Sequence, residues 1–254
     1  VLGEANVPEG GLPLTVAIQN TLQHLGVGVG QCLEIIIHSS IPIARGLGSG
    51  AAVSVALIRA LSAYFQQELP QGEVSELAYR VEKLHHGTPS GIDNTVVAYG
   101  EPVYFLRGRP PELLRVGAPL TVIIADTGIP SPTKVAVGWV RQAWERDGKG
   151  YEALFDSIGD VVRRAREALE AGRLQELGSL MDENQELLRA MEVSSPELEA
   201  LVGGAKSAGA WGAKLSGAGC GGNMIALVEE DGACQVREEL LKAGAASVII
   251  TRVE

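Results

Sequence analysis

The chain has 254 residues, of which 46% are hydrophobic and 20% charged, as expected for a globular protein with a substantial core. Its net charge is −10 and it lacks a dense run of lysine and arginine, so we expect no nucleic-acid surface. No apolar run reaches the roughly 18 residues of a membrane span, and no signal peptide is visible. Cys32, Cys220 and Cys234 form no paired motif, which favours a reducing, cytoplasmic location.

The first part of the chain predicts helices, short strands and a glycine-rich turn. Apolar spacing predicts a helix that begins near Leu14 and stops at Gly26, and the β-branched run CLEIIIHSSIP predicts a strand. Further helices are expected over about 51–65 and in EVSELAYRVEKLHH. TVVAYG and PVYFLRG read as strands.

The proline- and glycine-rich segment GRPPELLRVGAP predicts a boundary between two domains, 1–115 and 116–254. The second domain opens with an expected strand, LTVIIADTG, and three helices near 133–147, 151–171 and 173–191. A fourth helix is predicted in SSPELEALVGGAKSAG, and GNMIALV and ASVIITRV read as closing strands. Strict βαβ alternation is lacking, which indicates an α+β fold.

Two glycine-rich segments are candidates for ligand contact. ARGLGSGAA lies between a predicted strand and a helix, where glycines and unpaired helix N–H groups can cradle a phosphate. It lacks a Walker ending, while its match to G-x-G-x-x-A leaves a dinucleotide-binding alternative open. KLSGAGCGGNMIALV precedes a strand, which excludes that fingerprint. Its backbone could lie flat beside a ligand or form a bulged connection.

The stretch VEKLHHGTPSGIDNTVVAYG gathers polar side chains around one turn. Glu82 and His85 have the spacing of a helical metal site, but the motif occurs once, and His85 and His86 read as pocket or packing residues. Ser90 lacks the preceding glycine of a nucleophile elbow. Asp93 follows the turn and Glu82 precedes it, so two carboxylates can converge, one on Mg²⁺ and one on a hydroxyl. The alternative is that Asp93 caps a turn.

These three segments, in this order, resemble the GHMP kinase superfamily, and HGTPSGIDN resembles the signature of its mevalonate kinases. The resemblance covers nearly the whole chain. It implies a ribosomal-protein-S5-like N-terminal domain and a ferredoxin-like C-terminal domain, with ATP and substrate between them. It also implies transfer of the ATP γ-phosphoryl group to mevalonate to give 5-phosphomevalonate, early in isoprenoid biosynthesis, by a protein expected to be a homodimer.

The resemblance assigns roles to individual residues. Asp93 corresponds to the catalytic base, and Glu82 corresponds to the glutamate that binds Mg²⁺. The residues assigned to the ATP phosphates are Arg45, Gly46, Leu47, Gly48, Ser49, Gly50, Ala51 and Ala52. Those assigned to the loop that closes over the substrate are Ser216, Gly217, Ala218, Gly219, Gly221 and Gly222.

Two departures from the family pattern bear on function. Gly50 stands where the family usually has a second serine that helps to bind Mg²⁺, so either Ser49 takes over as a Mg²⁺ ligand or water fills that coordination position. The first GHMP motif, with its lysine, is not in the sequence, so we expect a front segment to be missing. The alternatives are another GHMP kinase, such as a phosphomevalonate or homoserine kinase, and a truncated, catalytically impaired ATP-binding homologue. A dinucleotide-dependent oxidoreductase is a more distant one.

Overall fold

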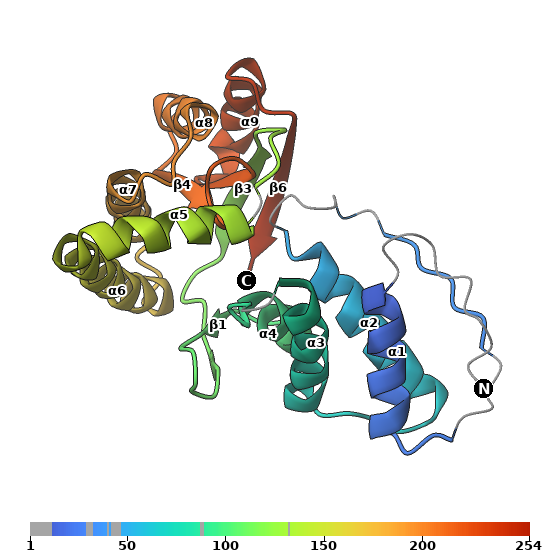
Figure 1. The fold of residues 1–254 in the computed structure, drawn as a ribbon. Coiled ribbons are helices and arrows are strands. Elements are labelled where there is room, and N and C mark those ends of the chain that lie inside the picture. Colours follow the sequence, from blue (N-terminus) through green and yellow to red (C-terminus); the bar gives the residue numbers. More distant parts are fainter. Residues whose placement is uncertain (1–11, 29–32, 40, 42–46, 87–88, 132) are drawn as a thin grey trace. The chain divides into compact units, whose positions relative to one another are not determined.

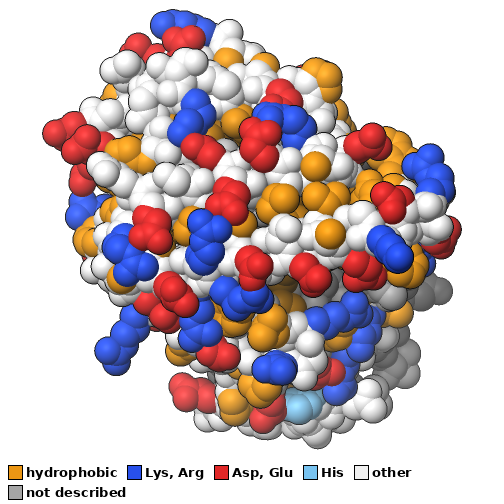
Figure 2. Space-filling model, turned by 90° about the vertical axis from the view of Figure 1, so that its left-hand side faces the viewer, with side chains coloured by type: hydrophobic (Ala, Val, Ile, Leu, Met, Phe, Trp, Pro, Cys, Tyr) orange, Lys and Arg blue, Asp and Glu red, His pale blue; other side chains and the backbone are white. Residues whose placement is uncertain are grey.

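The structure, a computed structural model, describes residues 12–28, 33–39, 41, 47–86, 89–131 and 133–254 (Figure 1). Contacts divide these residues into two units, which separate between Leu113 and Leu114; Leu47 belongs with the second unit. No helix in the described ranges is long and apolar enough to cross a membrane. Figure 2 shows basic and acidic side chains interspersed over the face that it presents.

The first unit is built mainly from helices. Its elements are α1 (Leu12–His24), α2 (Ser49–Tyr64), α3 (Gln71–His86), α4 (Ile92–Tyr99) and a short hairpin of β1 (Val103–Tyr104) and β2 (Glu112–Leu113). Apolar residues at helical spacing on α2 and α3, among them Val55, Ile58, Val74 and Leu77, form one core cluster. The predicted helices in this part of the chain are confirmed.

The prediction of a strand in TVVAYG is wrong, because these residues belong to α4. Gly91 adopts φ 88 and caps the helix, and Asn94, Thr95 and Ala98 are buried along it. The Nδ2 atom of Asn94 donates to the carbonyl oxygen and the hydroxyl of Ser75 on α3, at 3.1 and 2.9 Å. Packing against α3 therefore overrides the strand propensity of the β-branched residues.

The prediction of a strand in CLEIIIHSSIP is also not met over its described part, residues 33–39, which form no strand. A strand needs a neighbour for its backbone N–H and C=O groups, and none of the described strands pairs with this run. The isoleucine side chains of this run are correspondingly exposed, and that of Ile36 is 71% exposed.

The second unit combines a four-stranded antiparallel sheet with helices. Its strands are β3 (Leu120–Asp126), β4 (Gly212–Ser216), β5 (Asn223–Val228) and β6 (Ser247–Val253). Its helices are α5 (Thr133–Arg146), α6 (Gly148–Glu170), α7 (Leu174–Ala190), α8 (Pro196–Ser207), the short η1 (Glu230–Gly232) and α9 (Ala233–Lys242). The predicted helices and β3, β5 and β6 are confirmed, whereas β4 and α9 were not predicted.

The strand order β4-β5-β3-β6, with every pairing antiparallel, is that of a ferredoxin-like fold. This confirms the predicted α+β class. Leu198 and Leu201 of α8 and Val236 and Leu240 of α9 pack against Ile123 and the other inward residues of the sheet. Helix α8 begins as predicted, with the Leu198 N–H donating to the Ser195 hydroxyl at 3.4 Å.

Side chains of α7 accept hydrogen bonds from backbone N–H groups of β4, the edge strand of this sheet. The Ala213 N–H donates to Asp182 Oδ1 at 2.9 Å, and the Leu215 N–H donates to Gln185 Oε1 at 2.8 Å. The two acceptors stand three residues apart on one helix face, which matches the spacing of alternate N–H groups along β4. An edge that could pair with another strand is thereby closed by side chains.

Gln185 is 2% exposed, so its replacement tests this edge contact. We expect Gln185→Ala to lower the free energy of unfolding by about 1–3 kcal/mol, because the buried Leu215 N–H loses its acceptor. Urea denaturation measures the change, with Gln175→Ala on an exposed part of α7 as the matched control. Equal stability of the two variants would contradict the contact's importance.

Candidate active site

The first turn of α2 is the centre of the candidate site in the first unit. Gly48 adopts a left-handed conformation with φ 64 at the N-cap position, and the helix begins at Ser49. The first bond within the helix runs from the Ala52 N–H to the Gly48 carbonyl, at 2.9 Å. The N–H groups of Ser49, Gly50 and Ala51 therefore have no partner within α2, and the positive end of the helix dipole lies here.

Two carboxylate side chains approach this turn from other helices. A Cβ placed on Gly48 would lie 3.5 Å from both Cβ and Cγ of Asp93, in the first turn of α4. A Cβ placed on Gly50 would lie 3.1 Å from Oε1 of Glu82, which is on α3. The structure thus brings Gly48, Gly50, Glu82 and Asp93 together, as the sequence suggested, while their chemical roles stay predictions. Arg45 and Gly46 lie outside the described residues.

The other polar residues of this stretch have different positions. His85 and His86 end α3, but their side chains lie outside what the structure describes. Ser90 Oγ accepts from the Ile92 N–H at 3.3 Å, so this serine shapes the turn before α4. Among the described residues, no group of three or more His, Cys, Asp or Glu side chains is placed to hold a metal ion.

In the second unit, the predicted substrate loop is the turn between β4 and β5, and its glycines differ in surroundings. A Cβ on Gly219 would lie 2.2 Å from the Val193 carbonyl oxygen, and one on Gly221 would lie 2.9 Å from that of Ile129. Both glycines are therefore required by backbone packing. Gly217, with φ +92, has no described atom within 4 Å of such a Cβ, so its side of the loop is open.

The segment after β3 holds this loop, a contact that the sequence did not reveal. Ser131 Oγ donates to the Gly219 carbonyl at 2.5 Å, and Thr127 Oγ1 donates to the Gly222 carbonyl at 2.8 Å. The Gly222 N–H donates to the Ile129 carbonyl at 2.9 Å. The only available sequence signal was the polar run IPSPTK directly after a strand.

Lys214 is a second residue that sequence reasoning missed. It lies on β4, just before the loop, and its Nζ donates to the Leu215 carbonyl at 2.6 Å. Burial disfavours the charged ammonium and lowers the pKa of Lys214 from 10.5 to about 8. A cation with this environment, next to a glycine-rich loop, suits an anionic ligand.

The lowered pKa of Lys214 predicts a change of stability with pH. The unfolded chain holds this proton up to about pH 10.5, whereas the folded protein releases it near pH 8. The unfolded state binds more protons between these values, so the free energy of unfolding contributed by this site rises with pH across that window. Relative to that of Lys214→Met, the free energy of unfolding of the wild type should rise by up to roughly 3 kcal/mol between pH 7 and pH 10.

Urea denaturation of both proteins at the two pH values measures this gain. The comparison cancels the other titrating groups, which the variant retains. If the free energies of unfolding of wild type and Lys214→Met differ by the same amount at both pH values, the assigned pKa is contradicted.

Comparison with known proteins agrees with the fold. Residues 13–101 match the GHMP kinases N terminal domain, and residues 165–246 match the GHMP kinases C terminal domain. The chain belongs to the GHMP kinase family. Its structure superimposes on that of "L. major mevalonate kinase in complex with R-mevalonate", with a TM-score of 0.83 and 30% identity, covering 99% of this chain and 79% of that one.

Within the family, several similar curated proteins are mevalonate kinases. That of Thermococcus gammatolerans is 41% identical over 206 residues, which cover 79% of this chain and 61% of that protein. That of Methanothermobacter thermautotrophicus is 34% identical over 208 residues, covering 78% of this chain and 68% of that protein. The chain spans 61% and 63% of the lengths of the Thermococcus gammatolerans and Pyrococcus horikoshii relatives.

Proposed function

We propose that the protein is a mevalonate kinase, which transfers the γ-phosphoryl group of ATP to the terminal hydroxyl of mevalonate. The observation that carries the proposal is the approach of Glu82 and Asp93 to the first turn of α2, in a chain 41% identical to a mevalonate kinase. Phosphoryl transfer needs in-line positioning and neutralised charge more than covalent chemistry from the protein.

The first turn of α2 suits the phosphates of ATP. Its N–H groups and the positive end of the helix dipole can face an anion, and Gly48 and Gly50 let that anion approach the backbone. Gly219 and Gly221 pack against backbone carbonyl groups and so fix the loop between β4 and β5. Gly217 has open space around it and is available for a contact with substrate or phosphate.

Glu82 and Ser49 offer the hard oxygen donors that Mg²⁺ prefers. When bound, Mg²⁺ would neutralise phosphate charge during transfer. Gly50 supplies no hydroxyl, and a Cβ there would crowd Oε1 of Glu82 at 3.1 Å. Water fits the coordination position of the missing hydroxyl, since Mg²⁺ usually keeps several waters.

Asp93 is the base in this proposal. Its carboxylate accepts the proton of the mevalonate hydroxyl as that oxygen attacks the γ-phosphorus. Because Asp93 is exposed and lies beside Gly48, the hydroxyl and the phosphates can reach it together. The homodimer expected from the resemblance stays a prediction.

Asp93→Asn tests the assigned base. We expect kcat to fall by roughly 10²–10⁴-fold while ATP affinity changes little, because the amide cannot accept the proton. Steady-state kinetics and ATP titration give the two quantities, with the exposed Asp156→Asn as the control. Retained turnover in Asp93→Asn would remove Asp93 from this role. Wild-type protein that binds ATP without turnover would favour the impaired homologue.

A panel of alcohols tests the substrate. The full-length protein should phosphorylate mevalonate in preference to phosphomevalonate and homoserine, with ATP consumption and product mass as the measurements. The phosphomevalonate kinases among the similar structures, at 20% and 19% identity, share the fold alone. Turnover of another alcohol without turnover of mevalonate would exclude the proposed substrate.

A further inference from the structure

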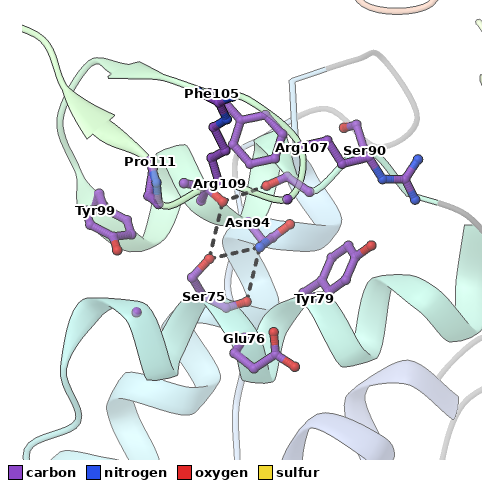
Figure 3. Close-up of a pocket in the computed structure, with 14 residues that line it drawn as sticks. Ser75, Glu76, Tyr79, Ser90, Asn94, Tyr99, Phe105, Arg107, Arg109 and Pro111 are labelled. Carbon is purple, nitrogen blue, oxygen red and sulfur yellow. Dashed lines mark hydrogen bonds between the residues drawn. The ribbon is translucent and has the colours of Figure 1, made fainter.

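A groove in the first unit lies on the side of α4 that carries Asn94 and Thr95 (Figure 3). It has a volume of about 480 Å³ and runs between α3, α4 and the turn that links β1 to β2. This volume is within the range of small-molecule sites. Asp93, the proposed base, is not among the residues that line the groove.

The wall of the groove is aromatic at its centre. A Cβ placed on Gly91 would lie 3.3 Å from Cζ of Phe105 and 3.5 Å from Cε2 of Tyr79, so each ring lies close to Gly91 at the start of α4. Lys83 Nζ lies 4.3 Å from the centroid of the Tyr79 ring, which adds positive charge beside this wall.

Asn94 places an unused acceptor on the floor. Its side-chain nitrogen donates twice to Ser75, and because the Ser75 carbonyl can only accept, the amide orientation is fixed. Asn94 is 3% exposed, and its Oδ1 accepts no hydrogen bond from any described residue. Figure 3 shows this oxygen turned away from Ser75, toward the side where Tyr79 and Ser90 lie.

The charges at the rim are mainly positive. Arg107 and Arg109 are exposed lining residues that form no ion pair within the described part of the chain. Glu76, the one carboxylate among the described lining residues, pairs with Arg80 at 3.3 Å. Arginine suits phosphate and carboxylate groups, because its planar fork can bind two oxygens at once.

We propose that this groove binds a small anionic molecule that carries a hydroxyl, at a site separate from that of phosphoryl transfer. The arginines meet the anion, and Asn94 Oδ1 accepts from the ligand's hydroxyl. The Ser90 hydroxyl, which already accepts from the Ile92 N–H, keeps its own proton to donate. Ligand contact with Asn94 would be made one residue from Asp93, so occupancy can influence the orientation of the base.

Calorimetric titration with glycerol 3-phosphate tests the groove. The protein is first saturated with Mg²⁺, a non-hydrolysable ATP analogue and mevalonate, so that the proposed catalytic site is filled. Titration with glycerate distinguishes a carboxylate from a phosphate preference. We expect one site, with affinity lowered about tenfold or more in Arg107→Gln/Arg109→Gln and little changed in Arg115→Gln, an exposed arginine that does not line the groove.

Inorganic phosphate lacks the carbon-bound hydroxyls of glycerol 3-phosphate. Its affinity should therefore be lower than that of glycerol 3-phosphate by about tenfold or more. Equal loss of affinity in Arg115→Gln, or unchanged affinity in the double variant, would overturn the proposal. Binding that disappears when the catalytic site is filled would overturn it as well. Because binding is measured directly, a failure here is distinguishable from a failure to phosphorylate mevalonate.

Discussion

The lack of side chains at Gly48 and Gly50 is the constraint on which the candidate site depends. Gly48 adopts φ +64, a conformation that residues with a side chain rarely adopt, and a Cβ on Gly50 would lie 3.1 Å from Oε1 of Glu82. Three helices can therefore converge at the first turn of α2, with two carboxylates beside its N–H groups. Carboxylates are stabilised near the N-terminal end of a helix, and a metal-bound phosphate can meet the same N–H groups.

The glycines of the loop between β4 and β5 differ in the space around their Cα atoms. Gly219 and Gly221 are packed against carbonyl groups of Val193 and Ile129, and Ser131 and Thr127 bond to the loop backbone. Such contacts give the loop a defined shape, and they leave Gly217 as its open position. Preorganised backbone donors stabilise developing charge better than mobile ones, because little reorganisation is needed.

Local periodicity and caps predicted most helices, and the resemblance to GHMP kinases implied the ferredoxin-like half. The turn between α3 and α4 predicted that Glu82 and Asp93 converge, while their chemical roles stay predictions. Prediction from the sequence failed where distant contacts decide. The β-branched run before Gly100 forms a helix because Asn94 and Ala98 pack on α3, and residues 33–39 form no strand because no described strand pairs with them. Gln185 and Ser131 make contacts with segments that are distant in the sequence, and the pKa of Lys214 depends on its burial. No local sequence pattern indicates either.

Helix α4 contributes residues both to the candidate active site and to the proposed anion groove. Asp93 lies beside Gly48 and the first turn of α2, whereas the next residue, Asn94, lines the groove against α3. A rigid helix of eight residues that is held by Ser75 can carry a displacement from one side to the other. The fold thus offers a physical connection between the proposed anion groove and the proposed base.

The affinity of the protein–ATP complex for Mn²⁺, measured by electron paramagnetic resonance, tests most directly whether Glu82 holds the metal beside the first turn of α2. Glu82→Gln should weaken Mn²⁺ binding by about tenfold or more, because an amide is a poorer ligand than a carboxylate for a hard cation. The exposed Glu101→Gln, in the same unit, should leave the affinity unchanged. Mn²⁺ affinity that is the same in wild type and Glu82→Gln would contradict the proposed metal site.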